Sequence, residues 1–118
     1  MSNGYIFPNQ TFSSIFRIRK ISLNLQDNLE RHLLQIYMGA KNDKYYRGFT
    51  TRYTNMTIKL RVLVEKTLRD YDKIYNDPNT PISIKDYVLV LADYAIKHLH
   101  KVEDLWDRIN RARELVGW

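Results

Sequence analysis

The feature of this 118-residue chain that most constrains its fold is the recurrence of apolar residues at every third or fourth position through three long stretches. That spacing places side chains on one face of an α-helix. None of the four glycines and three prolines falls inside these stretches, which favours long helices over a turn-rich sheet. The clearest stripe accompanies a helix predicted from Thr50 to Tyr75 and consists of Phe49, Tyr53, Met56, Leu60, Leu63, Thr67, Tyr71 and Ile74.

A first helix is predicted from Thr11, as its N-cap, to Met38, with Gly39 as the stop. A short strand over residues 12–25 is the alternative, but the length and continuity of the apolar stripe favour helix. The stripe consists of Ile15, Ile18, Ser22, Leu25, Leu29, Leu33 and Ile36, and is widened by Phe12, Ile21, Leu34 and Tyr37.

A third helix has the most distinct start signal of the three. Ser83 and Asp86 form a capping-box-like pair, while Ile82 and Tyr87 occupy the two positions of a hydrophobic staple. Gly117 is expected to close the helix. Its stripe consists of Tyr87, Leu91, Ala95, Leu99, Val102, Trp106, Ile109 and Ala112, thickened by Val88, Ile96 and Leu105.

The predicted fold class is all-α: an extended N-terminal arm over residues 1–10, then a bundle of three long amphipathic helices over 11–118. A polar, basic linker over 40–48 joins the first two helices, and Pro78 ends the second because it cannot continue a helix. The apolar arm is expected to pack on the bundle or on a neighbouring subunit. Because the first helix is apolar over more than one narrow face, we expect an oligomer.

Several protein classes are excluded by residues that the sequence lacks. Without cysteine there is no disulfide scaffold, thiolate metal site or cysteine nucleophile. No apolar run is long enough to span a membrane, and residues 1–20 lack the charged-then-apolar order of a signal peptide. We therefore expect a cytoplasmic location with no membrane partner.

No catalytic constellation is recognisable in the sequence. His98 and His100 diverge by about 200° on a helix, and His32 is isolated, so we expect the histidines on the surface or at a helix flank. Glu103 and Asp107 share a helix face, but neighbouring lysine and arginine residues make surface ion pairs the simpler interpretation. The sequence predicts a protein that is not an enzyme and needs no metal or cofactor.

Positive charge is concentrated in the first part of the chain. Residues 1–69 hold 12 Lys/Arg and 4 Asp/Glu, whereas residues 70–118 hold 7 and 9. A one-sided basic excess is typical of proteins that bind polyanions. A solvated basic surface without a partner is the alternative.

One basic feature follows the helix geometry of residues 50–75. Four cations recur at seven-residue steps, each of which drifts by only about 20° around a helix, so they predict a straight ridge suited to successive phosphates. They are Arg52, Lys59, Lys66 and Lys73. The remaining predicted nucleic-acid-binding residues are Lys44, Tyr46 and Arg47 in the linker and Arg17, Arg19 and Lys20 in the first helix. Tyrosines interleaved with cations can stack on bases, so we expect binding by charge and shape to RNA or DNA, weakened by salt.

Four motifs follow one another in a recognisable order: Phe7-Pro8, Leu33-Leu34, KLRVLV over 59–64 and ISIKDY over 82–87. This layout resembles the accessory variability determinant proteins of diversity-generating retroelements, which belong with the four-helix-bundle, ribosomal intervening-sequence protein family. The resemblance covers about residues 7–110. Family members usually have another amphipathic helix before the Phe-Pro segment, where this sequence has six residues.

The resemblance implies a truncated four-helix-bundle protein that binds RNA and DNA through a basic surface, with a ring-shaped pentamer as one possible assembly. It also implies association with a reverse transcriptase during error-prone cDNA synthesis, in which the accessory protein is not itself catalytic. A different hypothesis is a small phage or virion assembly protein whose N-terminal arm docks on a neighbouring subunit.

Overall fold

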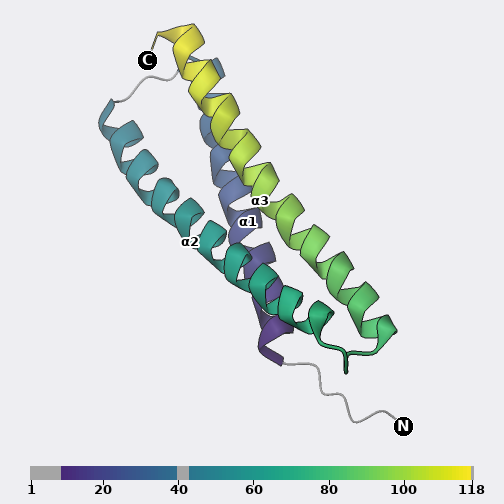
Figure 1. Ribbon diagram of the computed structural model, residues 1–118. Helices are drawn as coiled ribbons and strands as arrows, with labels where there is room; N and C mark the ends of the chain where they lie inside the picture. The colour runs from purple at the N-terminus through teal and green to yellow at the C-terminus, as the bar shows by residue number, and fades with distance from the viewer. Residues whose placement is uncertain (1–8, 40–42, 118) are drawn as a thin grey trace.

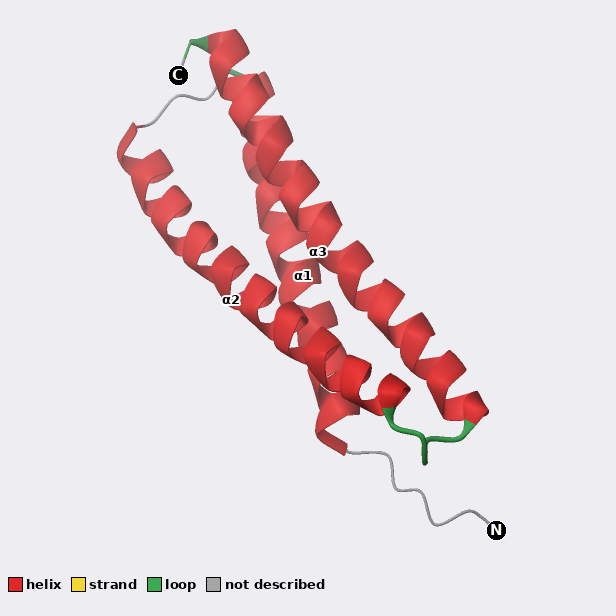
Figure 2. Ribbon diagram, viewed as in Figure 1, coloured by secondary structure: helices red, strands yellow, loops and turns green. Residues whose placement is uncertain are grey.

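The computed structural model describes residues 9–39 and 43–117, except for the side chains of 9–12 and 43–45. In this part of the chain the regular elements are three helices and no strand: α1 (Asn9–Tyr37), α2 (Asp43–Asn76) and α3 (Ile82–Val116). The helices run up, down and up, so α1 and α3 are parallel while α2 is antiparallel to both (Figure 1). Figure 2 shows how little of the described part of the chain lies outside helices. The predicted all-helical bundle is confirmed, whereas residues 1–8 of the predicted arm lie outside the described residues.

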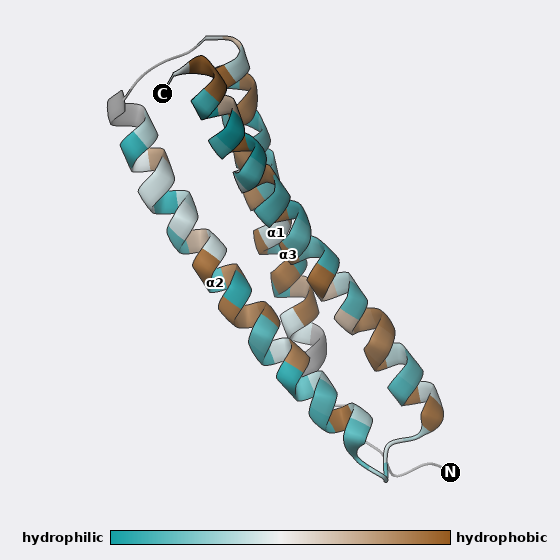
Figure 3. Cartoon of the chain, turned by 45° about the horizontal axis from the view of Figure 1, so that its top comes forward, coloured by the Kyte–Doolittle hydropathy of each residue, from teal (hydrophilic) through white to brown (hydrophobic). Residues whose placement is uncertain are grey.

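The helices form a long rod of 62 × 20 × 17 Å. The most extensive interhelical contact is between α1 and α3, and α2 leans away from them toward its N-terminal end (Figure 1). Apolar and hydrophilic segments alternate along the helices in Figure 3, as expected when each helix buries one face. The core runs along the whole rod and includes the fully buried Ile18, Leu25, Leu29, Ile36, Leu60, Ala95, Val102, Ile109 and Ala112.

The predicted apolar stripes account for most of this core, with exceptions at their edges. Leu34 and Tyr37, which were predicted to widen the first stripe, are 59% and 61% exposed. They lie 100° or more around the helix from the buried line through Ile18 and Ile36, so the prediction was wrong for these two residues. At the start of α3, Tyr87 is partly exposed and its neighbour Val88 occupies the core position instead.

The predicted linker over residues 40–48 is wrong for residues 43–48, because α2 already begins at Asp43. Tertiary contacts explain the longer helix. The Tyr46 ring lies 5.3 Å from the His32 ring of α1 and 3.7 Å from the Arg113 guanidinium of α3. These contacts extend the buried stripe of α2 upstream and offset the helix penalty of Gly48, which is about 1 kcal/mol.

The start of α3 also differs from the prediction. Pro81 is the N-cap residue, and no side chain caps this helix end. The backbone carbonyl of Pro81 accepts hydrogen bonds from the N–H groups of Ile84 and Lys85, both at 3.0 Å. The capping box of Ser83 and Asp86 is therefore wrong, because the first turn closes on Pro81 before Ser83 can act as a cap.

The start of α1 differs from the prediction, whereas the ends of α1 and α3 match it. α1 begins at Asn9, so Thr11 is inside the helix and is not its N-cap. Gly39 (φ 82°) and Gly117 (φ 77°) adopt the left-handed conformation that suits glycine, which confirms both predicted stops. After α2, the N–H of Asn79 donates to a carboxylate oxygen of Asp77 at 2.9 Å, completing the predicted turn at Pro78.

Candidate nucleic-acid interface

The predicted cationic ridge lies on the surface of α2. Arg52, Lys59, Lys66 and Lys73 are all exposed. Each seven-residue step advances about 10.5 Å along the helix axis, so the four side chains span most of the helix length on one side.

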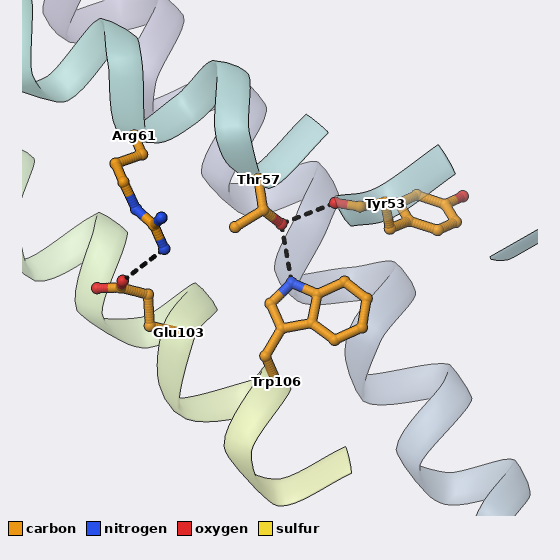
Figure 4. A network of polar contacts seen from close by, with 5 residues as sticks. All are labelled: Tyr53, Thr57, Arg61, Glu103 and Trp106. Carbon is orange, nitrogen blue, oxygen red and sulfur yellow. Dashed lines mark hydrogen bonds and ion pairs between the residues drawn. The ribbon is translucent and has the colours of Figure 1, made fainter. Parts of the chain in front are cut away.

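The contacts of α2 with its neighbours show which side that is. On the margin that faces α3, Trp106 Nε1 donates to Thr57 Oγ1 at 2.8 Å, and Arg61 pairs with Glu103 at 3.1 Å (Figure 4). On the margin that faces α1, Met56 lines a groove with residues of α1. Because successive residues turn by about 100°, the ridge lies beside Met56, on the α1 side.

This groove brings cations of α1 to the ridge. It has a volume of about 380 Å³ and is lined by Arg17, Lys20, Ile21, Asn24 and Met56. The stacking of His32 on Phe49 sets the antiparallel register and places the middle of α1 level with Lys59. We call the combined surface the α1/α2 basic face; it consists of Arg17, Lys20, Arg52, Lys59, Lys66 and Lys73.

The charges on the basic face are not neutralised within the described part of the chain. None of its six cations takes part in an ion pair there, although the guanidinium of Arg52 lies 5.5 Å from the ring of Tyr53. Four described cations elsewhere are paired: Arg31 with Asp27, Arg61 with Glu103, Lys97 with Asp93 and Arg108 with Asp104. The half-buried Asp70 is the acidic residue in line with the ridge. Lys and Arg outnumber Asp and Glu twofold in α1 and α2 and equal them in α3.

The structure separates other predicted residues from this face. Arg19 lies on the α3 side of α1, where its charge acts on His98. Arg47 is exposed on α2 but lies about 140° around the helix from Arg52. The side chain of Lys44 lies outside the described residues. The half-buried Tyr46 is already stacked between its protein neighbours, so its ring is engaged inside the bundle.

Sequence reasoning missed an aromatic stack at the end where α2 leans away. His32 lies 4.1 Å from Phe49 and 5.3 Å from Tyr46, measured between ring centroids, with both rings nearly parallel to its own. The Arg113 guanidinium covers Tyr46, and Trp106 lies 6.3 Å from Phe49. These large planar groups fill the wider space between the three helices and hold the N-terminal half of α2 in position.

The surface position predicted for two of the histidines is wrong. His32 is 1% exposed, and burial, followed by the charge of Arg113, lowers its pKa from 6.5 to about 4. His98 is 8% exposed, and its pKa is lowered by burial and then by the charges of Lys101 and Arg19. Both positions continue an apolar stripe at three- or four-residue spacing, which was the signal available in the sequence. His100 is exposed, as predicted.

A second polar cluster connects α1 with α3. Ser22 Oγ donates to the carbonyl of His98 at 3.1 Å and lies 3.0 Å from His98 Nδ1. Gln26 Nε2 donates to Ser22 Oγ at 2.9 Å, and Tyr94 meets the His98 ring edge-on at 4.5 Å. The cluster satisfies buried polar groups and therefore has a structural role.

The carboxylates considered for chemistry are engaged in ion pairs or dispersed. Glu103 pairs with Arg61, and Asp104 with Arg108. Across the described residues, no group of three or more histidine, aspartate or glutamate side chains is arranged to hold a metal ion. The remaining feature of the described surface is the exposed positive charge of the α1/α2 basic face.

Comparisons with known proteins add no family to this description. No protein-family model, curated protein or solved structure matches the chain. In residues 9–39 and 43–117, no helix combines the length and apolar character needed to cross a membrane. These comparisons therefore supply no function for the chain.

Proposed function

We propose that this protein is a non-catalytic nucleic-acid-binding module that holds phosphates along its α1/α2 basic face. The observation that carries the proposal is that Arg17 and Lys20 of α1 line a groove with Met56 of α2, beside which the ridge lies, with no ion pair to the six cations among the described residues. Exposed, unneutralised cations at regular intervals attract a phosphate backbone and release its counterions. The face contains no exposed aromatic platform, so binding depends on charge and shape and not on base sequence.

The proposal is tested by reversing two charges on the ridge. Lys59→Glu/Lys66→Glu should weaken binding to a structured RNA and to single-stranded DNA, measured by fluorescence anisotropy over a series of salt concentrations. Each lost phosphate contact lowers the slope of log affinity against log salt by about 1, so the double variant should lower it by about 2.

The matched control changes the same net charge on α3. Lys97→Glu/Lys101→Glu alters two exposed lysines on a helix whose charges balance, and it should leave most of the affinity and the slope in place. If both double variants lose affinity equally, net charge alone governs binding and the basic face is not the site. If neither loses affinity, the proposal is wrong.

The identity of the protein partner belongs to the same proposal. The layout of motifs described above implies a reverse transcriptase, which the accessory protein would help to engage its template. Co-purification of the wild-type protein with a reverse transcriptase encoded beside its gene, and stimulation of cDNA synthesis, are the expected results. The absence of such a gene would remove this partner while leaving the binding surface to be tested separately.

A role in assembly is the second candidate, and one observation favours it. Large apolar side chains are exposed at both ends of the rod, including Ile82 at 78% and Leu115 at 82%. Such patches often mark contacts between proteins. Deleting residues 1–8 discriminates between the candidates, because loss of assembly with unchanged RNA affinity would favour the assembly role.

A further inference from the structure

The outer face of α1 carries a second, regular stripe whose apolar side chains are largely exposed. Its apolar members are Phe16, Leu23 and Leu34, which are 69%, 43% and 59% exposed. Between them on the same line lie the exposed Lys20, Asp27 and Glu30. The steps alternate between four and three residues, which is the spacing of the a and d positions of a coiled coil.

This stripe is complementary to the same stripe on a second copy whose α1 helix runs in the opposite direction. In an antiparallel pair centred at residue 25, each residue faces the one whose number makes the sum 50. Phe16 then meets Leu34 of the second copy, and Lys20 meets Glu30 of the second copy. Each of these contacts occurs twice, because a twofold axis makes an isologous interface.

The central layer is the weakest part of the pairing. Leu23 faces Asp27 of the second copy there, and Asp27 is held by Arg31 of its own helix at 2.9 Å. That layer contributes little, so the association depends on the apolar layers at the ends and on the charged layers between them.

We propose that two copies of this chain associate through their α1 helices in this antiparallel register. The occupant of the stripe is a second copy, because one symmetric register pairs Phe16 with Leu34 at the ends and Lys20 with Glu30 next to them, and leaves only the central layer without a favourable match. This inference does not depend on the proposed nucleic-acid binding, since the association is measured on the protein alone.

The test is a charge exchange followed by analytical ultracentrifugation over a range of protein concentrations. Lys20→Glu places two glutamates in each charged layer, and Glu30→Lys places two lysines there, so each should raise the dimer dissociation constant by about tenfold or more. The double variant Lys20→Glu/Glu30→Lys restores opposite charges and should recover the wild-type constant. Both substituted positions are on an exposed helix surface, and circular dichroism checks that the helices of the three variants remain folded.

Two further variants separate this interface from general effects. Lys59→Glu makes the same change of charge on α2 and should leave dimerisation unchanged. Leu34→Asp should abolish the dimer, whereas Leu115→Asp, at the more exposed α3 position, should not. A wild-type protein that stays monomeric at all concentrations, or single and double variants with equal dissociation constants, would overturn the proposal.

Discussion

The buried His32 makes the stability of this protein sensitive to acid in a way that the structure quantifies. Its pKa is about 4 in the folded protein and about 6.5 in an unfolded chain. Between these values the unfolded chain binds a proton that the folded protein does not bind, so the free energy of unfolding falls as the pH falls through this range. Above about pH 7 the residue is neutral in both states and contributes no pH dependence.

The size of the effect follows from the two pKa values. One unit of difference corresponds to about 1.4 kcal/mol, so the destabilisation from His32 is about 2 kcal/mol at pH 5 and about 3 kcal/mol at pH 4. A domain of this length is stable by only about 5–15 kcal/mol. The protonation of one side chain therefore removes a substantial share of the total.

The perturbation that isolates this effect is His32→Phe. Phenylalanine keeps a planar ring between Phe49 and Tyr46 but cannot be protonated. The free energy of unfolding of both proteins is measured in urea between pH 7.5 and 4. Subtracting one profile from the other cancels the contributions of the carboxylates and of His98, because both proteins contain them. The stability difference between the variant and the wild type should rise by about 2 kcal/mol from pH 7 to pH 5. Parallel stability profiles for the two proteins would refute the reasoning, as would an NMR titration of His32 with a midpoint near 6.5.

Three other substitutions test the packing. Leu29→Ala, in the fully buried part of α1, should lower the free energy of unfolding by about 2–5 kcal/mol in urea denaturation. Trp106→Phe removes the hydrogen bond to Thr57 and should cost about 1 kcal/mol beyond the lost apolar area. Arg61→Ala breaks an exposed ion pair with Glu103 and should change the same quantity by less than about 1 kcal/mol. A larger effect for Arg61→Ala than for Leu29→Ala would contradict the assignment of the core.

The parts of the fold that the sequence predicted are those governed by local rules. The stripe through Leu60, Thr67 and Tyr71 is regular over seven turns, and the glycine stops need only a left-handed residue. The parts that it missed depend on other helices. Nothing local to residues 43–48 indicates that Tyr46 will stack on His32, and this tertiary contact decides where α2 begins.

The candidate site shows the same division. The spacing of the four ridge cations is sufficient to align them, because it depends on one helix alone. Whether Arg17 or Arg19 joins them depends on how α1 is rotated against its neighbours, and that rotation is set by side chains such as Ser22 and His98 at the α1–α3 contact. The sequence therefore supplied the cations, and the packing decided which of them share a face.

The α1/α2 basic face and the proposed dimer interface both include residues of α1. The geometry of the dimer therefore decides how the two basic faces are arranged. A dimer with antiparallel α1 helices has its twofold axis perpendicular to the plane of the two helices, so the margin that bears Arg17 faces the same way in both copies. The two basic faces, apart from Lys20, which pairs with Glu30 of the second copy at this register, would then lie on one side of the dimer and form a single longer surface. An RNA long enough to cross both copies should bind with a steeper salt dependence than one that covers a single copy. Because Leu34→Asp changes no cation, it should reduce the affinity for the long RNA to that for the short one. An unchanged affinity for the long RNA would mean that the two surfaces act independently.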